Sequence, residues 1–133
     1  MKCDECGGKV VHYDTGFVMR LDDREFPTTA AYRQCEKCET WTISHAELVT
    51  AEVESAVQIL TEIDRPLPGP DLKWARKAGC LSPEEVAGYL GIDPEEYADT
   101  ERSLEPVPFT LRFAMAWLVE EFGYRDQALR LTG

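Results

Sequence analysis

The sequence predicts an α+β fold in two parts, a small β domain followed by an all-α domain. Three observations support this prediction. Strand-like segments separated by turn residues fill the first part of the chain, between two Cys-x-x-Cys pairs. An amphipathic pattern with a period of three to four residues then covers residues 44–63. Beyond residue 70, several short segments begin with helix-start signals.

The β domain is predicted from short apolar runs and the turn residues between them. We expect strands at residues 10–13, 17–21 and 30–34, with a turn at Asp22 and Asp23. A domain of this size buries little apolar surface and usually needs a disulfide or a metal ion to stay folded.

The two cysteine pairs have the spacing of a metal site. Cys3 and Cys6 form one Cys-x-x-Cys turn, and Cys35 and Cys38 form the other. Each such turn directs two sulfurs to one point, and two turns together form a tetrahedral four-sulfur site that suits Zn²⁺. Gly7 follows the first pair, where the turn favours a residue that tolerates a positive φ. We therefore expect one structural zinc ion in a zinc ribbon.

Four cysteines can also serve as a redox pair, a disulfide framework or the ligands of an iron–sulfur cluster. A thioredoxin-like redox pair would precede a helix in a βαβ unit, whereas both pairs here border strand-like segments. The first residues lack the basic and apolar regions of a secretory signal, so we expect a cytoplasmic protein with reduced thiols rather than disulfides. An iron–sulfur cluster also uses four thiolates and stays open as an alternative. Cys80 is expected to be a small buried apolar side chain.

A long helix is expected to follow the β domain. Ser44 and Glu47 have the spacing of a capping box, and apolar residues recur every three or four positions up to Ile63. Three prolines and a glycine in residues 65–70 predict a linker, which divides the chain into domains 1–64 and 71–133. We expect the apolar stripe of this helix, including Leu60, to be buried against a second copy of the chain or against the second domain, in addition to covering the ribbon; packing on its own ribbon alone is the alternative. We also expect a homodimer.

The second domain is predicted to be helical throughout. Asp71 is expected to cap its first helix. Ser82 and Asp93 each precede a proline and two glutamates, which is typical of a helix start. A longer apolar helix is expected over residues 109–122, ended by Gly123.

The helical half resembles the XRE (Cro/repressor-type) helix-turn-helix family. The resemblance lies in "LKWARKAG" for the first helix, "LSPEEVAGYLGI" for the second helix and its turn, and Glu101-Arg102 at the end of the third. "PFTLRFAMAWL" resembles the helix that follows in that family. The resemblance implies an all-α, XRE-type domain that contacts DNA.

Taken together, the order of parts resembles the MqsA-like antitoxins, which have a YgiT-type zinc finger before their helix-turn-helix. The resemblance covers nearly the whole chain. It implies that Cys3, Cys6, Cys35 and Cys38 hold zinc and that the zinc domain engages a toxin. It also implies that the C-terminal domain dimerises and binds operator DNA.

The charge of the chain departs from this pattern. The net charge is −11 and the isoelectric point is near 4.6, which opposes contact with phosphates. The second helix begins with Pro83, where the family often has a glutamine, and residues 82–105 contain eight acidic residues against Arg102 alone. The remaining DNA-binding candidates are Lys73, Arg76, Lys77 and Arg102.

These observations lead to two functional hypotheses. The first is a zinc-binding regulator of the antitoxin type, which controls transcription, neutralises a partner protein, or does both. The second is a protein-interaction module that does not bind DNA and uses an acidic, repurposed helix-turn-helix. Its candidate contacts with a basic partner are Glu95, Glu96, Asp99 and Glu105. The sequence contains no nucleophile–base pair or phosphate-binding loop, so we expect no enzymatic activity.

Overall fold

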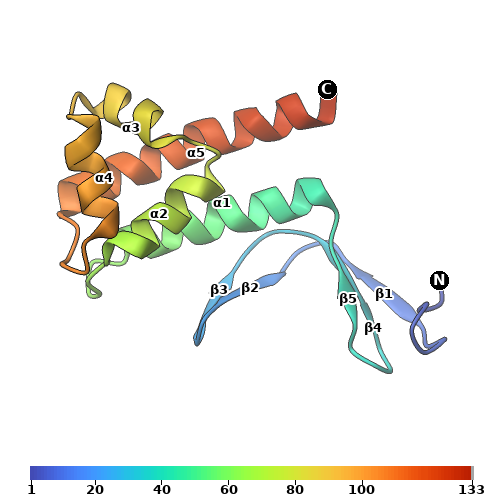
Figure 1. Cartoon of the computed structure of the whole chain (residues 1–133). Helices are drawn as coiled ribbons and strands as arrows, with labels where there is room; N and C mark the ends of the chain where they lie inside the picture. The colour runs from blue at the N-terminus through green and yellow to red at the C-terminus, as the bar shows by residue number, and fades with distance from the viewer. Residues whose placement is uncertain (133) are drawn as a thin grey trace. The chain divides into compact units, whose positions relative to one another are not determined.

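The structure divides the chain into two units. It is a computed structural model that describes the backbone of residues 1–132 and the side chains of residues 1–124. The first unit comprises Met1–Ala51, and the second begins at Glu52. The architecture is α+β, as the sequence predicts, and the described residues form strands in the first unit and five helices (Figure 1). Among the described residues, no helix is both long and apolar enough to cross a membrane.

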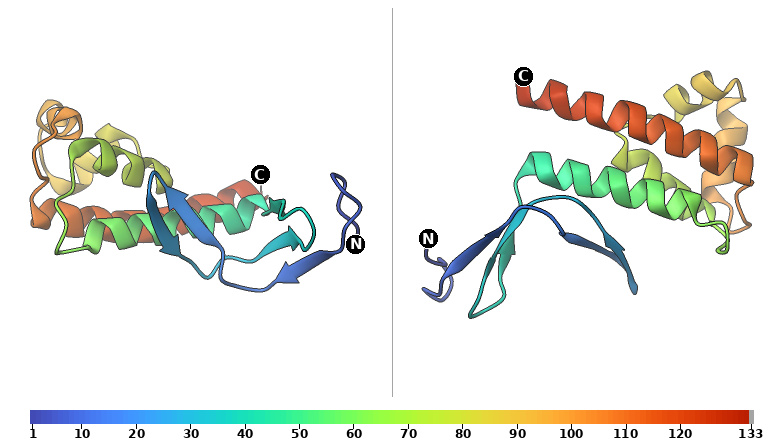
Figure 2. Two further views of the ribbon diagram at one scale, coloured as in Figure 1. Left: turned by 90° about the horizontal axis from the view of Figure 1, so that it is seen from below. Right: turned by 180° about the vertical axis from the view of Figure 1, so that it is seen from behind.

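The first unit contains two small antiparallel sheets. One has the strand order β1-β4-β5 and the other pairs β2 with β3 (Figure 2). The strands are β1 (Val10–Tyr13), β2 (Val18–Leu21), β3 (Arg24–Pro27), β4 (Tyr32–Cys35) and β5 (Trp41–Thr42). The turn at Asp22 is confirmed, and it has the positive φ of 56° that a tight hairpin requires. The sequence did not predict β3 or β5, because one is charged and ends in proline and the other has two residues.

A small aromatic core holds this unit together. Phe17, Ala30 and Ala51 are buried, and Met19, Tyr32 and Ile43 pack against them. The register of β1 with β4 places Val10 opposite Cys35 and Tyr13 opposite Tyr32, so the two tyrosine rings stack 4.9 Å apart. The same register sets Cys35 at the end of β4, where the chain turns toward β5.

Helix α1 (His45–Thr61) begins where the sequence predicts. The backbone N–H of Glu47 donates to the hydroxyl of Ser44 at 3.2 Å, which is half of the predicted capping box. The carboxylate of Glu47 is used differently, because it accepts from the backbone N–H of Ala31 at 2.8 Å. This bond joins the first turn of α1 to the β segment of its own unit.

The second unit is built from the end of α1 and four further helices. These are α2 (Gly69–Ala78), α3 (Pro83–Leu90), α4 (Pro94–Arg102) and α5 (Phe109–Thr132). Ser82 and Glu85 form a complete capping box at α3, Asp93 caps α4, and Gly91 joins the two helices with a left-handed φ of 68°. The predicted starts of both helices are therefore confirmed.

The predicted linker at residues 65–70 is part of the helical unit. Leu67 is 2% exposed, and its carbonyl accepts from the N–H of Val107 at 2.8 Å. The N–H of Gly69 donates to the carbonyl of Ser103 at 2.9 Å. Helix α2 also starts at Gly69, before the expected cap Asp71, with Pro68 as its N-cap. The chain therefore divides inside α1 rather than at the prolines.

Most of the apolar stripe of α1 is buried within the helical unit, as one of the two expected arrangements requires, whereas Ile63, beyond the end of the helix, is exposed. Ile59 and Leu60 are at most 1% exposed. Arg112 of α5, itself 1% exposed, closes the C-terminal end of α1 by donating to the carbonyls of Leu60 at 2.9 Å, Ile59 at 3.2 Å and Arg65 at 2.8 Å. These bonds satisfy carbonyls that a helix end leaves without partners. Leu60 is therefore a core residue rather than a dimer contact.

Helix α5 does not end at Gly123. A β-carbon at this position would lie 2.6 Å from Cγ2 of Val53, so the glycine permits α5 to approach α1 closely. The two helices run side by side in both views (Figures 1 and 2). The sequence prediction was wrong because glycine has two uses in helices, as a terminator and as a close-contact residue.

Candidate metal centre

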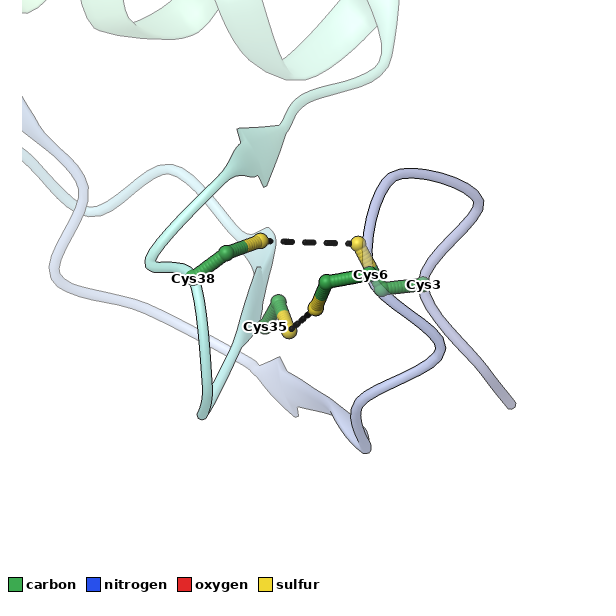
Figure 3. Close-up of side chains that lie close together, drawn as sticks. All are labelled: Cys3, Cys6, Cys35 and Cys38. Atoms are coloured by element: carbon green, nitrogen blue, oxygen red, sulfur yellow. Dashed lines mark hydrogen bonds between the residues drawn. The ribbon is translucent and has the colours of Figure 1, made fainter.

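The four predicted ligands converge on one point. The Sγ atoms of Cys3, Cys6, Cys35 and Cys38 all lie within 4.8 Å of one another. Cys3 and Cys6 come from the N-terminal loop, Cys35 is the last residue of β4, and Cys38 lies in the turn between β4 and β5 (Figure 3). Two sulfur–sulfur contacts join the two cysteine pairs: 3.6 Å from Cys3 to Cys38 and 3.4 Å from Cys6 to Cys35.

These distances fit a tetrahedral metal site better than disulfides. A zinc–sulfur bond of about 2.3 Å places the sulfurs of a tetrahedron about 3.8 Å apart, close to the observed distances. A disulfide would need a sulfur–sulfur distance of about 2.05 Å, and all four thiols are unbonded. Four thiolates would complete the coordination of zinc and leave no position for a catalytic water.

The first ligand turn is stabilised by its own backbone. The N–H of Gly7 donates to the carbonyl of Cys3 at 2.8 Å, and the N–H of Cys3 donates to the carbonyl of Gly8 at 2.8 Å. Gly7 has the positive φ of 74° expected after a ligand pair. The N–H of Gly8 then points at Sγ of Cys6, 3.4 Å away.

The second ligand turn repeats this pattern. The N–H of Glu39 donates to the carbonyl of Cys35 at 3.1 Å, and the N–H of Cys35 donates to the carbonyl of Thr40 at 2.9 Å. Glu39 takes the place of Gly7 and has a φ of 62°. The N–H of Lys37 lies 3.4 Å from Sγ of Cys35. Both turns therefore aim backbone N–H groups at sulfur, which stabilises the thiolate form that binds metal.

Gly8 supports the site in a way that the sequence did not reveal. A β-carbon on Gly8 would lie 2.9 Å from Sγ of Cys35, 3.2 Å from Sγ of Cys6 and 2.8 Å from Cβ of Lys37. Only a residue without a side chain leaves room for the sulfurs at their present separation. The Gly-Gly pair was the available signal, but it indicated the positive φ of Gly7 and not the close approach at Gly8.

The protonation of the thiols reflects their crowding. Hydrogen bonds from the side chain and backbone of Thr40 lower the pKa of Cys38 to about 6. The backbone N–H of Cys38 lowers the pKa of Cys35. The N–H of Gly8 favours the thiolate of Cys6, but contacts with Cys35 and Cys38 outweigh it and raise the pKa of Cys6 to about 12. The thiol of Cys38 thus ionises easily, whereas a bound cation would be needed to ionise the thiol of Cys6 at neutral pH.

Arg76 is not the surface base that the sequence suggested. Its guanidinium is buried and forms a bidentate ion pair with Glu101, with Nε 2.6 Å from Oε2 and Nη2 3.1 Å from Oε1. Its Nη1 donates to the carbonyl of Leu81 at 2.7 Å. Arg76 therefore cannot reach a phosphate, which corrects its place among the DNA-binding candidates.

The other candidates remain on the surface. Lys73 and Lys77 are exposed on α2, and exposed Arg102 pairs with Asp99 on α4. The four candidate partner contacts are also exposed: Glu95, Glu96, Asp99 and Glu105. Glu101, which is one of the eight acidic residues between residues 82 and 105, is instead buried in an ion pair with Arg76.

Cys80 is neither a ligand nor fully buried. It is half-buried, follows the end of α2 and has a positive φ of 56°. The expectation of a buried apolar cysteine was wrong, because α2 ends at Ala78 and Cys80 lies in the turn after its cap, Gly79.

No protein-family model and no solved structure matches this chain. Among curated proteins, the chain is similar to a proline–tRNA ligase of Syntrophotalea carbinolica, with 32% identity over 104 residues. The match covers 73% of this chain, and the chain spans 17% of the ligase.

Proposed function

We propose that the protein is a zinc-binding regulator of the antitoxin type that acts by neutralising a basic partner protein. The observation that carries the proposal is the charge of the helical unit around α4. Glu95, Glu96 and Asp99 are exposed on this helix, while Arg76 is withdrawn into an ion pair with Glu101. Such a surface attracts cationic proteins and repels phosphates.

Zinc has a structural role in this proposal. The first unit buries only a small core, so a metal held by the four cysteines would supply the stability that its apolar contacts do not. The proposal includes no catalysis, because four thiolates leave zinc no open position. Ligase activity is not part of it, since the similarity to the proline–tRNA ligase spans 17% of that protein.

Control of transcription is the second candidate function. The observation that favours it is the short connection from α3 to α4, in which Gly91 adopts a left-handed conformation. Helix pairs with such a turn place their second helix in the major groove of DNA. In that pose Glu95, Glu96 and Asp99 would lie near phosphates, which would lower affinity. Transcription control therefore ranks below partner neutralisation.

The two candidates are separated by a paired binding experiment. The zinc-loaded chain is tested in gel shifts with DNA from upstream of its own reading frame, and in co-purification with the product of the adjacent reading frame. The same assays are repeated with a Glu95→Lys, Glu96→Lys, Asp99→Lys variant. A Lys73→Glu, Lys77→Glu variant serves as the control for charge change on a different helix.

Partner neutralisation predicts that the charge reversal abolishes co-purification and that the wild type gives no specific DNA shift at physiological salt. Tight operator binding that survives the α4 reversal but is lost in the Lys73→Glu, Lys77→Glu variant would contradict the proposal. It would mean that α2 contacts DNA and that the acidic helix faces away from it.

A further inference from the structure

Helix α5 carries a row of exposed aromatic side chains on the side opposite its buried residues. Phe109, Phe113, Trp117 and Tyr124 have exposed fractions of 47%, 45%, 63% and 38%. Their spacings of four, four and seven residues place them on one face of the helix. The other side of α5, which includes Met115, is buried. We call the four exposed residues the aromatic face of α5.

This face is larger than scattered surface residues would produce. With about 200 Å² for a fully exposed aromatic side chain, the four fractions correspond to roughly 400 Å² of surface. Single exposed apolar residues need no explanation, but a face of this size equals the largest apolar patch of a typical monomeric protein, and such patches are often functional. An ordinary protein interface buries about 800 Å² per partner, so the aromatic face would supply its centre and polar neighbours would supply its rim.

The charges of the helical unit indicate which partner fits. Residues 52–124 contain fifteen acidic and six basic side chains, and two of the basic ones, Arg76 and Arg112, are buried. Glu120 and Glu121 are exposed on α5, between Trp117 and Tyr124 in the sequence. Burial, with the nearby carboxylates of Glu54 and Glu120, raises the pKa of Tyr124. Acidic groups therefore lie at the end of the aromatic face.

A second copy of this chain fits the face poorly, because it would bring two acidic units together. A cationic partner fits it in two ways. Carboxylates attract arginine and lysine, and exposed aromatic rings bind guanidinium groups through cation–π contacts. Within the chain, the ring of Phe109 already makes a contact of this kind with the buried guanidinium of Arg112, which lies 4.9 Å from the ring centre.

We propose that the aromatic face of α5 is the docking site for an arginine-bearing amphipathic segment of a basic partner protein. Apolar side chains of the segment would pack on Phe113 and Trp117, and its arginines would stack on the ring faces and pair with Glu120. This inference rests on the proposed function for the basic character of the partner. It adds a docking site on α5 to the acidic surface of α4.

The test uses synthetic peptides as probes. Three amphipathic helical peptides share a leucine face and differ in the other face, which contains arginine, lysine or glutamate. Calorimetry measures their binding to the zinc-loaded full chain. The test variant is Phe113→Ser, Trp117→Ser, and the matched control is Ile63→Ser, which removes an exposed apolar residue elsewhere in the same unit. Circular dichroism verifies that each variant retains its helices.

We expect the arginine peptide to bind the wild type most tightly, the lysine peptide less tightly and the glutamate peptide not at all. The test variant should bind the arginine peptide about tenfold more weakly or worse, as expected for loss of a central aromatic contact, while the control is unchanged. Equal binding by the test variant, or equal binding of the arginine and glutamate peptides, would overturn the inference.

Two further measurements exclude other occupants. Sedimentation equilibrium that shows a dimer lost only in the test variant would assign the face to a second copy and overturn the proposal. Binding of the wild type to phosphatidylglycerol vesicles, lost in the test variant, would assign the face to a membrane and would also overturn the proposal.

Co-purification with the adjacent-frame product separates this inference from the proposed function. If that product needs Glu95, Glu96 and Asp99 but binds the test variant as tightly as the wild type, the docking site is wrong and the proposed function stands. If the arginine peptide binds as expected but that product does not bind, the docking site stands and the proposed function is wrong.

Discussion

The ion pair between Arg76 and Glu101 should be a major contributor to the stability of the helical unit. Both side chains are 7% exposed, and the bidentate contact joins α2 to α4. Replacing Glu101 with leucine would remove the carboxylate and leave the buried guanidinium with its hydrogen bond to the carbonyl of Leu81. Removing one member of a buried pair costs about 3–5 kcal/mol, because the other charge is left without compensation.

For a unit of this size, 1 kcal/mol corresponds to about 4–8 °C in melting temperature, so Glu101→Leu should lower the transition by at least about 12 °C. Thermal unfolding is followed by far-ultraviolet circular dichroism. Glu95→Leu, on the exposed surface of the same helix, is the matched control and should change the transition by about 0.5 kcal/mol or less.

A double variant sharpens the prediction. Replacing both members, as Arg76→Met, Glu101→Leu, removes the stranded charge and should recover most of the loss. If Glu101→Leu unfolds at the same temperature as Glu95→Leu, the pair is solvated and the reasoning fails. If the double variant is less stable than Glu101→Leu, the penalty does not come from the unpaired arginine.

Three further predictions concern close packing and burial. Gly123→Ala should destabilise the helical unit by about 1–3 kcal/mol, although alanine has the better helix propensity, because its β-carbon would overlap Val53. Gly88→Ala has open space around it and should stabilise the unit by up to about 1 kcal/mol. Calorimetric melting distinguishes the two variants, and equal effects would contradict the contact with Val53. Gly8→Ala should weaken zinc binding in a competition titration with a chelator, with Gly88→Ala as the unchanged control, and an unaltered affinity would show that the turn can expand. Burial raises the pKa of Tyr97, so the folded state keeps this proton as pH rises above about 10 while the unfolded state loses it. The free energy of unfolding should therefore be constant up to about pH 10 and then fall by up to about 1.4 kcal/mol per pH unit. Urea unfolding at a series of pH values should show a smaller fall in Tyr97→Phe, and an identical fall in both proteins would refute this.

Local signals in the sequence were sufficient for much of this fold. The capping residues Ser82 and Asp93 and the turn at Gly91 predicted α3 and α4, because caps depend on neighbours in the chain. The cysteine spacing predicted which four side chains would meet, because each Cys-x-x-Cys turn is itself a local structure.

Features that depend on distant partners were missed. The neighbours of Gly123 in the sequence predict a helix end, because they do not reveal that Val53 packs against it. Arg76 resembles a surface base in the sequence, because its partner Glu101 lies 25 residues away. The prolines at 65–70 predict a linker, because the sequence does not reveal the hydrogen bond between Leu67 and Val107. In each case tertiary packing decided the role of the residue.

The most direct test of the metal centre is the metal content of the purified chain. Elemental analysis by plasma mass spectrometry, with colorimetric assay of acid-labile sulfide, should find one zinc ion per chain in the wild type and none in Cys35→Ser. Circular dichroism of the same samples should show that the helices persist when zinc is lost, because the helical unit has its own buried core. A wild type that contains iron and sulfide, or that retains no metal while its β segment stays folded, would contradict the structural zinc site.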